Sequence, residues 1–186
     1  MSDLAIAPLT PARWPDLEAL FGPNGASGGC WCMWWRWPRS QMARDKGEPA
    51  RAAFEARVAC EPPPGLLAYA DGHPVGWVQV TPSAELTGLA RSRVLKQIDD
   101  LPVWSLSCFF VTRSARRQRV ADRLIEAAKV FAAARGAPAL EAYPVDDAAP
   151  KIPFLFTGRA STFLRHGFVE VARRSPKRPI LRAALV

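Results

Sequence analysis

The sequence lacks the features of membrane, secreted and repeat proteins. No apolar run reaches 18 residues, and the N-terminus has no hydrophobic segment typical of a secretory signal. These absences predict a cytoplasmic protein that does not enter a membrane. Internal repeats and low-complexity segments are also missing, so we expect a single domain over residues 1–186.

Cysteine and histidine are scarce, with four and two copies. Cys30 and Cys32 do not have the spacing of a zinc or redox motif, and no second cysteine or histidine pair follows them. We therefore expect no metal and, in a reducing compartment, no disulfide. Cys108 lies in an apolar stretch and is predicted to pack as a small apolar residue. His73 and His166, each beside a turn glycine, are interpreted as structural or surface residues.

Acidic residues are fewer than basic ones, which gives a net charge of +8 and a pI near 9.9. Such a balance suggests an anionic partner, which could be a nucleotide cofactor, a nucleic acid or an acidic metabolite. A helix-turn-helix, a zinc finger and an RNP-type aromatic motif are all missing, so nothing beyond charge favours nucleic acid. The basic run at 173–178 has an ordinary explanation as a solvated turn between two strands.

The pattern of apolar residues and turn residues predicts an α/β fold with a mixed central sheet of six to seven strands. Residues 1–65 form a strand and a helical, tryptophan-rich part, 66–144 form the central sheet, and 145–186 add a helix and closing strands. The expected strands cover 4–9, 66–70, 74–80, 103–111, 138–144, 168–172 and 180–185, and the longer helices cover 11–20, 50–60, 117–135 and 158–166.

The most informative stretch runs from Val103 to Arg135, where an apolar strand leads through a basic turn into an amphipathic helix. With the strand at 138–144 it forms a β-α-β unit, whose two strands should be parallel. A helix start has unpaired backbone N–H groups and the positive end of the helix dipole. The arginines of this turn add further positive charge. The turn is therefore predicted to bind phosphate.

Four of the seven tryptophans lie between Trp31 and Trp37. This is too much aromatic area for an exposed loop. Trp31, Trp34, Trp35 and Arg36 could line a substrate pocket, or the segment could fill the core, and the sequence leaves both interpretations open.

The order of the expected elements and of several short sequence motifs resembles the GNAT superfamily of acyl-CoA N-acyltransferases. The resemblance rests on Pro-Val-Gly-Trp-Val at 74–78, Cys-Phe-Phe-Val at 108–111, the basic turn, and His-Gly-Phe at 166–168. It covers roughly residues 66–173. It implies a GNAT-like sheet with a β-α-β unit that binds acetyl-CoA as the cofactor.

In that superfamily the turn has the pattern (Gln or Arg)-x-x-Gly-x-(Gly or Ala), whose backbone N–H groups hold the pyrophosphate. Arg116 and Ala121 match it, but Arg119 replaces the glycine. Arg119 could point outward and bind phosphate, or it could fill the site. The resemblance assigns the cofactor to the backbone and side chains of Phe109, Phe110, Val111, Arg116, Arg117, Gln118, Arg119, Val120 and Ala121.

The implied reaction is attack of a neutral amine on the thioester carbonyl, which calls for a base, an oxyanion donor and an acid. Many superfamily members have a tyrosine as the acid where this chain has Phe163. Tyr143 could replace it, and Glu141 or Asp146 could act as the base. The alternatives are packing for Tyr143 and a solvated loop carboxylate for Asp146.

The resulting expectation is an N-acetyltransferase acting on a small-molecule or peptide amine. Arg36, Arg91 and Arg93 could recognise an anionic part of this acceptor. A homodimer is compatible with the resemblance. Phe163 and Arg119 motivate a second interpretation, a CoA-binding or ligand-sensing module without catalysis. Nucleic-acid binding is the third and is not expected.

Overall fold

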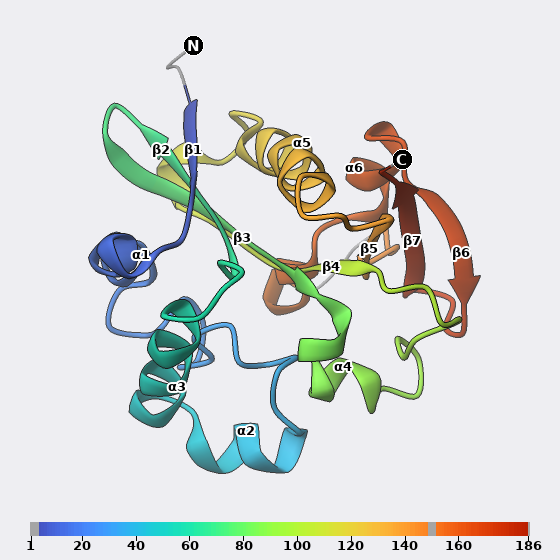
Figure 1. Ribbon diagram of the computed structural model, residues 1–186, viewed down its shortest axis with the longest axis horizontal. Coiled ribbons are helices and arrows are strands. Elements are labelled where there is room, and N and C mark those ends of the chain that lie inside the picture. The colour runs from blue at the N-terminus through green and yellow to red at the C-terminus, as the bar shows by residue number, and fades with distance from the viewer. Residues whose placement is uncertain (1–3, 149–151, 186) are drawn as a thin grey trace.

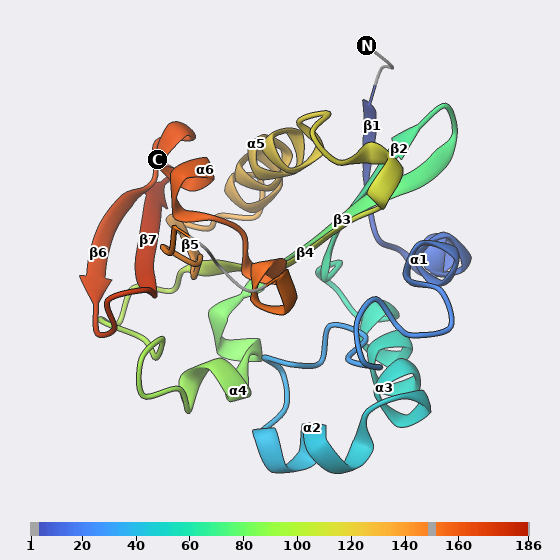
Figure 2. The same ribbon diagram turned by 180° about the vertical axis from the view of Figure 1, so that it is seen from behind.

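The computed structural model describes residues 4–148 and 152–185, and its centre is one seven-stranded mixed sheet (Figures 1 and 2). The strands lie in the order β1-β2-β3-β4-β5-β7-β6. Among these seven strands of the described residues, β4 and β5 are the pair that runs parallel, so the predicted mixed α/β fold is confirmed. The strands are β1 (Leu4–Pro8), β2 (Gly65–Ala70), β3 (His73–Pro82), β4 (Trp104–Val111), β5 (Ala139–Ala142), β6 (Val169–Arg173) and β7 (Pro179–Ala184).

Helices cover both faces of this sheet (Figures 1 and 2). One face carries α5 (Val120–Ala133) and α6 (Ala160–Arg165). The other carries α1 (Trp14–Phe21), α2 (Arg39–Asp45), α3 (Glu48–Val58) and α4 (Thr87–Ala90). Short 3-10 turns are η1 (Pro11–Arg13), η2 (Ser83–Glu85), η3 (Arg113–Ala115) and η4 (Ile152–Thr157). Within the described ranges, none of the helices combines the length and apolarity needed to cross a bilayer.

The strand β2 shows why the core has two sides. Leu66 and Ala68 pack with the α5 side, whereas Leu67 packs with the α1 and α3 side. Alternate residues of a strand point to opposite faces, so a strand covered on both faces reads as a continuous apolar run. The predicted hairpin between β2 and β3 is confirmed, with Asp71 and Gly72 at φ of 49° and 78° in its turn.

The β-α-β unit is confirmed as well, with β4 and β5 parallel and in register from Trp104–Leu140 to Leu106–Ala142. Helix α5 buries Val120 and Leu124 against the sheet, as its apolar stripe predicted. It begins at Val120 rather than near residue 117, because the preceding turn contains left-handed residues.

A β-bulge interrupts β4, which the sequence did not indicate. The pairing with β3 steps from Val80–Leu106 to Gln79–Cys108, so Ser107 is an extra residue. The bulge resets the alternation of side chains. Leu106 packs on the α5 side before it, and Cys108 packs on the opposite side after it.

Candidate functional site

The strands β4 and β5 separate after a short stretch of pairing. Their ladder ends at the pair Leu106–Ala142, whereas β4 continues to Val111. The N–H of Thr112 donates to the carbonyl of Val75 on the β3 side, at 3.0 Å. Because alternate residues of an antiparallel strand bond the same neighbour, the backbone groups of Phe109 and Val111 point away from β3. They face the side on which β5 has ended, as the resemblance implied for a cofactor arm.

The basic turn forms a cavity of about 260 Å³ at the start of α5. Five of the six turn residues assigned to phosphate line it, together with Val111, Ala115 and Asp122; these five are Arg116, Arg117, Arg119, Val120 and Ala121. Gln118 is not among the described lining residues, and its side-chain amide donates to the carbonyl of Ser114 at 2.8 Å. We call this cavity the cradle.

The backbone of the cradle keeps a geometry that normally belongs to glycine. Arg119 has φ of 59° and Arg117 has φ of 66°, both in the left-handed region. Arg119 is exposed and precedes the first residue of α5. The first helical hydrogen bond runs from the N–H of Arg123 to the carbonyl of Arg119, at 3.1 Å. The N–H groups between them have no partner within the helix and are available to an anion.

One acidic residue, Asp122, also lines the cradle, and its charge is compensated. Its Oδ1 lies 2.8 Å from Nε2 of His166 and 3.3 Å from Nη2 of Arg165. Burial would raise the pKa of Asp122, but the hydrogen bonds from His166 and Arg165 outweigh burial and lower it. His166 therefore ties the end of α6 to α5, in line with its structural interpretation.

Gly76 of β3 is a site residue that sequence reasoning overlooked. A Cβ there would lie 2.6 Å from Cγ1 of Val120 and 3.3 Å from Cδ1 of Leu124. Only a glycine lets the first turn of α5 approach the sheet this closely. The signal was the glycine inside the Pro-Val-Gly-Trp strand.

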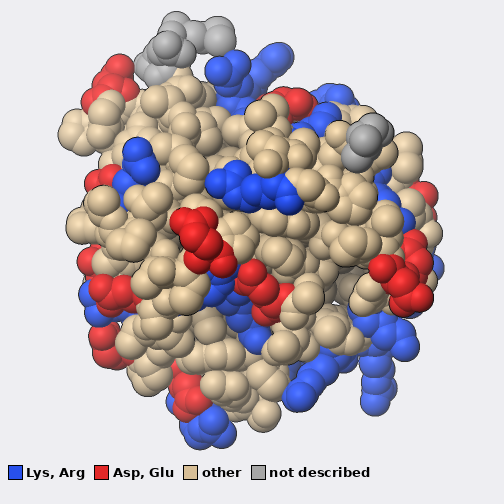
Figure 3. Space-filling model, viewed as in Figure 1, with Lys and Arg blue, Asp and Glu red and all other residues tan. Residues whose placement is uncertain are grey.

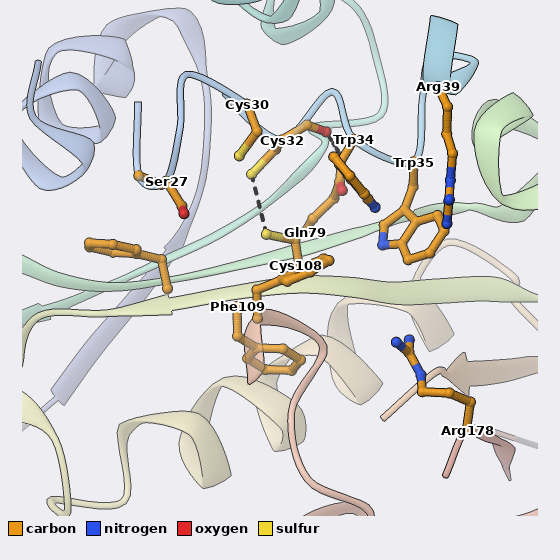
Figure 4. Close-up of a pocket in the computed structure, with 13 residues that line it drawn as sticks. Ser27, Cys30, Cys32, Trp34, Trp35, Arg39, Gln79, Cys108, Phe109 and Arg178 are labelled. Carbon is orange, nitrogen blue, oxygen red and sulfur yellow. Dashed lines mark hydrogen bonds between the residues drawn. The ribbon is translucent and has the colours of Figure 1, made fainter. Parts of the chain in front are cut away.

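An apolar cavity of about 310 Å³ lies beside β4, and Figure 4 shows its lining. The predicted residues Trp34 and Trp35 line it, and so do Phe109 and Phe110 of β4. The remaining described lining residues are Ala26, Ser27, Cys30, Cys32, Arg39, Gln79, Cys108, Phe156 and Arg178. We call this the acceptor cavity.

The tryptophan-rich segment is part core and part cavity wall. The ring of Trp31 packs 5.9 Å from that of Trp14 and 5.7 Å from that of Phe21, and it is not among the described lining residues. Arg36 also lies outside the lining and is buried. Its Nη1 lies 2.6 Å from Oε2 of Glu85. Both interpretations of the segment therefore apply, to different residues.

Contacts with η2 and α4 fix this segment in place. Glu85 accepts hydrogen bonds from Arg57 as well as from Arg36. Burial would raise the pKa of Glu85, but its bonds to the two arginines outweigh burial and lower it. The N–H of Gly88 donates to the carbonyl of Trp35 at 2.8 Å, and a Cβ on Gly88 would lie 2.3 Å from the carbonyl oxygen of Trp37.

Three thiols line the acceptor cavity. Sγ of Cys32 lies 3.7 Å from Sγ of Cys108 and accepts a hydrogen bond from Nε1 of Trp77 at 3.1 Å. Burial raises the pKa of Cys30 to about 11. The hydrogen bond with Cys32, followed by burial, raises the pKa of Cys108 as well. Both thiols are therefore protonated at neutral pH and are weak nucleophiles.

The three predicted catalytic residues lie outside the described lining of both cavities. Tyr143 is buried and donates to Oε2 of Glu141 at 3.0 Å, and burial raises its pKa far above the ordinary value. Glu141 also binds Arg182. Asp146 is exposed and accepts a hydrogen bond from Arg173 at 2.8 Å. Their catalytic roles stay predictions.

Three further residues singled out in the sequence, Phe163, Arg91 and Arg93, are not among the described lining residues of either cavity. Phe163 occupies the position where the resemblance implies a tyrosine that acts as the general acid. Its ring packs 5.8 Å from that of Phe109 and 5.3 Å from that of Phe168. Arg91 and Arg93 are exposed and are not among the described lining residues.

Arg178 is the lining residue that sequence analysis missed most clearly. It belongs to the basic run interpreted as a solvated turn, yet it is half-buried and its guanidinium points toward the acceptor cavity (Figure 4). The local signal gave no indication of this, because the turn reaches the cavity only through the placement of β7 between β5 and β6.

Comparisons with solved structures agree with the fold. A Corynebacterium glutamicum protein of the group 'histone acetyltransferase HPA2 and related acetyltransferase' is 20% identical. Its TM-score is 0.57, over 98% of this chain and 96% of that one. A GNAT family acetyltransferase from Listeria monocytogenes is 14% identical, with a TM-score of 0.60 over 97% and 94%. The PaiA N-acetyltransferase from Thermoplasma acidophilum, solved with coenzyme A, is 12% identical, with a TM-score of 0.50 over 98% and 99%.

At these identities the structural likeness establishes the fold alone. No curated protein matches this chain. The model of the Acetyltransferase (GNAT) family matches residues 31–155, which include the tryptophan-rich segment, the diverging strand β4 and the cradle. The chain therefore belongs to the GNAT family of acetyltransferases.

Proposed function

We propose that this protein transfers an acetyl group from acetyl-CoA to the amine of a small acceptor. One observation carries the proposal: the half of β4 that extends beyond its pairing with β5 joins two cavities of opposite character. Val111 lines the basic cradle, and Phe109 and Phe110 line the apolar acceptor cavity. An extended ligand lying along these three residues would place a phosphate group in one cavity and a thioester in the other.

The cradle would hold the pyrophosphate of the cofactor. The free N–H groups at the start of α5 supply hydrogen bonds, and the exposed guanidinium groups of Arg116, Arg117 and Arg119 supply positive charge. The pantetheine arm would then bond to the backbone of Phe109 and Val111, as an added strand does. Family members generally use acetyl-CoA, which supports this assignment.

The chemistry begins with the lone pair of a neutral amine attacking the thioester carbonyl carbon. A C–N bond forms, and the carbonyl oxygen becomes an oxyanion. Collapse of the oxyanion would re-form the carbonyl and break the C–S bond. Water would take the proton from the nitrogen, and the departing thiolate would take a proton back from water, so that the products are an amide and the CoA thiol. The N–H of Phe109 points away from β3 and is the oxyanion donor that we assign.

The acceptor cavity itself favours the neutral amine. Its described lining residues include no aspartate or glutamate that would stabilise an ammonium ion. Burial in apolar surroundings disfavours the charged form and lowers the pKa of an amine. The acceptor would therefore enter without its extra proton or lose it to water, without a carboxylate base in the wall.

Calorimetric titration with CoA and with acetyl-CoA tests the cofactor half. We expect saturable binding in the micromolar range, weakened by salt because the cradle contacts phosphate through exposed charges. Absence of binding at high micromolar ligand would overturn the proposal. Turnover is tested by acetyl-CoA consumption with a panel of amines.

A non-catalytic CoA-binding module is the second candidate function. It is favoured by Phe163, which has no proton to donate and is packed between two aromatic rings. Saturable CoA binding without consumption of acetyl-CoA by any amine would establish it. Nucleic-acid binding is less favoured. On the face seen in Figure 3, acidic side chains of the described residues are interspersed with the basic ones.

A further inference from the structure

An arginine without an acidic partner lines the acceptor cavity. Arg178 directly precedes β7, and its Nη2 donates to the carbonyl of Tyr143 at 2.9 Å. Its Nε is buried and has no hydrogen-bond partner. Burial lowers the pKa of this guanidinium, and no neighbouring charge offsets the effect. Burying a cation without a counter-charge is costly, so an anion in the cavity would stabilise this residue.

Two other arginines whose side chains are largely buried have carboxylate partners. Arg36 has Glu85 at 2.6 Å, and Arg182 has Glu141 at 2.6 Å. Within the described residues, no carboxylate lies within ion-pair distance of Arg178. The contrast indicates that the partner of Arg178 comes from outside the chain.

A second donor without a partner faces the same cavity. Nε1 of Trp35 is buried and has no hydrogen-bond partner, and Trp35 lines the cavity beside Arg178. Figure 4 shows Arg39 extending from the start of α2 alongside Trp35, while Arg178 approaches from the opposite side. Donors therefore converge on a cavity whose described wall has no carboxylate.

The remaining wall defines the rest of the ligand. The rings of Trp34, Phe109, Phe110 and Phe156 make the surroundings largely apolar. The volume of about 310 Å³ is at the small end for ligand cavities. A planar guanidinium matches the two oxygens of a carboxylate. A fitting ligand thus has a carboxylate at one end and a small apolar body.

We propose that the acceptor is a small amine that also carries a carboxylate and an apolar side group, as an apolar amino acid does. Arg178 binds the carboxylate, and Trp35 donates a second hydrogen bond to it. This inference rests on the proposed function, since it assigns the acceptor of the same reaction.

Matched pairs of amines that differ only in the carboxylate test the inference. The probes are L-phenylalanine against 2-phenylethylamine and L-leucine against isopentylamine. Binding to the CoA-loaded protein is followed by tryptophan fluorescence, and turnover by acetyl-CoA consumption. We expect the carboxylate-bearing member to bind about tenfold to a hundredfold more tightly, because charge-assisted bonds to a guanidinium are lost without it. In turnover the preference should appear in KM.

Variants then locate the effect. Arg178→Met should abolish the preference within each pair and leave CoA affinity unchanged, whereas Arg178→Lys should retain part of it. Trp35→Phe keeps the ring, removes the Nε1 donor and should reduce the preference several-fold. The matched control is Arg174→Met, because Arg174 lies in the same turn but donates to the carbonyls of Val94 and Lys96.

Equal binding of both members of each pair, or no binding of either at millimolar concentration, would overturn the inference. So would a parallel loss of CoA affinity in Arg178→Met, because Arg178 would then serve the cofactor. If the carboxylate-bearing member binds through Arg178 but acetyl-CoA is not consumed, the ligand class stands and the proposed acetyl transfer fails.

Discussion

The two cavities along β4 differ in the groups that they would offer to a ligand. The cradle offers backbone N–H groups at the start of α5, and its three arginines are exposed to solvent. The acceptor cavity is formed by side chains from several elements, of which Cys32, Trp35, Gln79 and Cys108 are buried, and the ion pairs of Glu85 with Arg36 and Arg57 hold its tryptophan-rich wall. The cradle can therefore change side chains and keep its geometry, whereas the acceptor cavity depends on its side-chain contacts.

The largest expected effect is on the wall of the acceptor cavity. Glu85→Gln leaves the buried guanidinium of Arg36 without its counter-charge, since the Arg36 side chain is only 6% exposed. We expect the free energy of unfolding to fall by about 3 kcal/mol, measured by urea titration. CoA affinity should stay unchanged at temperatures where the variant is folded.

This effect has a defined pH dependence. Glu85 has a pKa below its ordinary value in the folded state, so its stabilisation is present above the unfolded pKa of about 4.3 and is lost as pH falls through the lower folded value. The difference in stability between wild type and variant should therefore shrink as the pH falls through the folded pKa of Glu85, which lies below the ordinary value. Glu48→Gln, which removes an exposed carboxylate partner of Arg51, is the control and should cost less than about 1 kcal/mol. Equal losses in both variants would contradict the network.

The second effect is on the cradle. Gly76→Ala places a Cβ against Val120 and displaces the first turn of α5, at a cost of about 2 kcal/mol in unfolding free energy. CoA affinity should fall, because the N–H groups of that turn move. Calorimetry and thermal unfolding measure both quantities.

Val120→Ala provides the matched test for this clash. It removes the methyl group nearest to the new Cβ, so the double variant should recover CoA affinity relative to Gly76→Ala alone. Additive losses would mean that the close approach of α5 and β3 does not shape the cradle.

The smallest effect is at the position where the family has glycine. Arg119→Gly removes a left-handed arginine, so we expect the free energy of unfolding to rise by about 0.5–1 kcal/mol. CoA affinity should change by less than about threefold, because one exposed charge contributes little. A much larger loss of affinity would show that side chains dominate the cradle, and the comparison with the acceptor cavity would fail.

Local patterns in the sequence were sufficient to predict much of the fold. Asp71-Gly72 predicted the hairpin because few residues accept its turn geometry, and the stripe along α5 predicted which side of the helix is buried. The cradle was equally predictable, since a strand, a turn and a helix start lie within one short stretch.

Features that depend on contacts between distant parts of the chain, or on an irregular backbone, could not be predicted from local patterns. The extra residue Ser107 reverses which face Cys108 occupies, and nothing in an apolar strand marks a bulge. Positive φ values at Trp31 and Cys32 break the periodicity of the tryptophan-rich segment, so its core and cavity residues could not be separated. Arg178 enters the cavity only because β7 inserts beside β5.

The raised thiol pKa values have a consequence for acyl exchange. A thioester in the acceptor cavity would lie among Cys30, Cys32 and Cys108, and capture of its acetyl group requires a thiolate. With a pKa of about 11, Cys30 ionises so rarely near neutral pH that self-acylation should be slow. Peptide mass spectrometry after incubation with acetyl-CoA should show no acetyl group on Cys30 or Cys108 at pH 7, and any labelling of Cys30 should grow roughly tenfold per pH unit below that pKa. The burial of these two thiols thus keeps them from taking the acetyl group of a thioester that lies beside them.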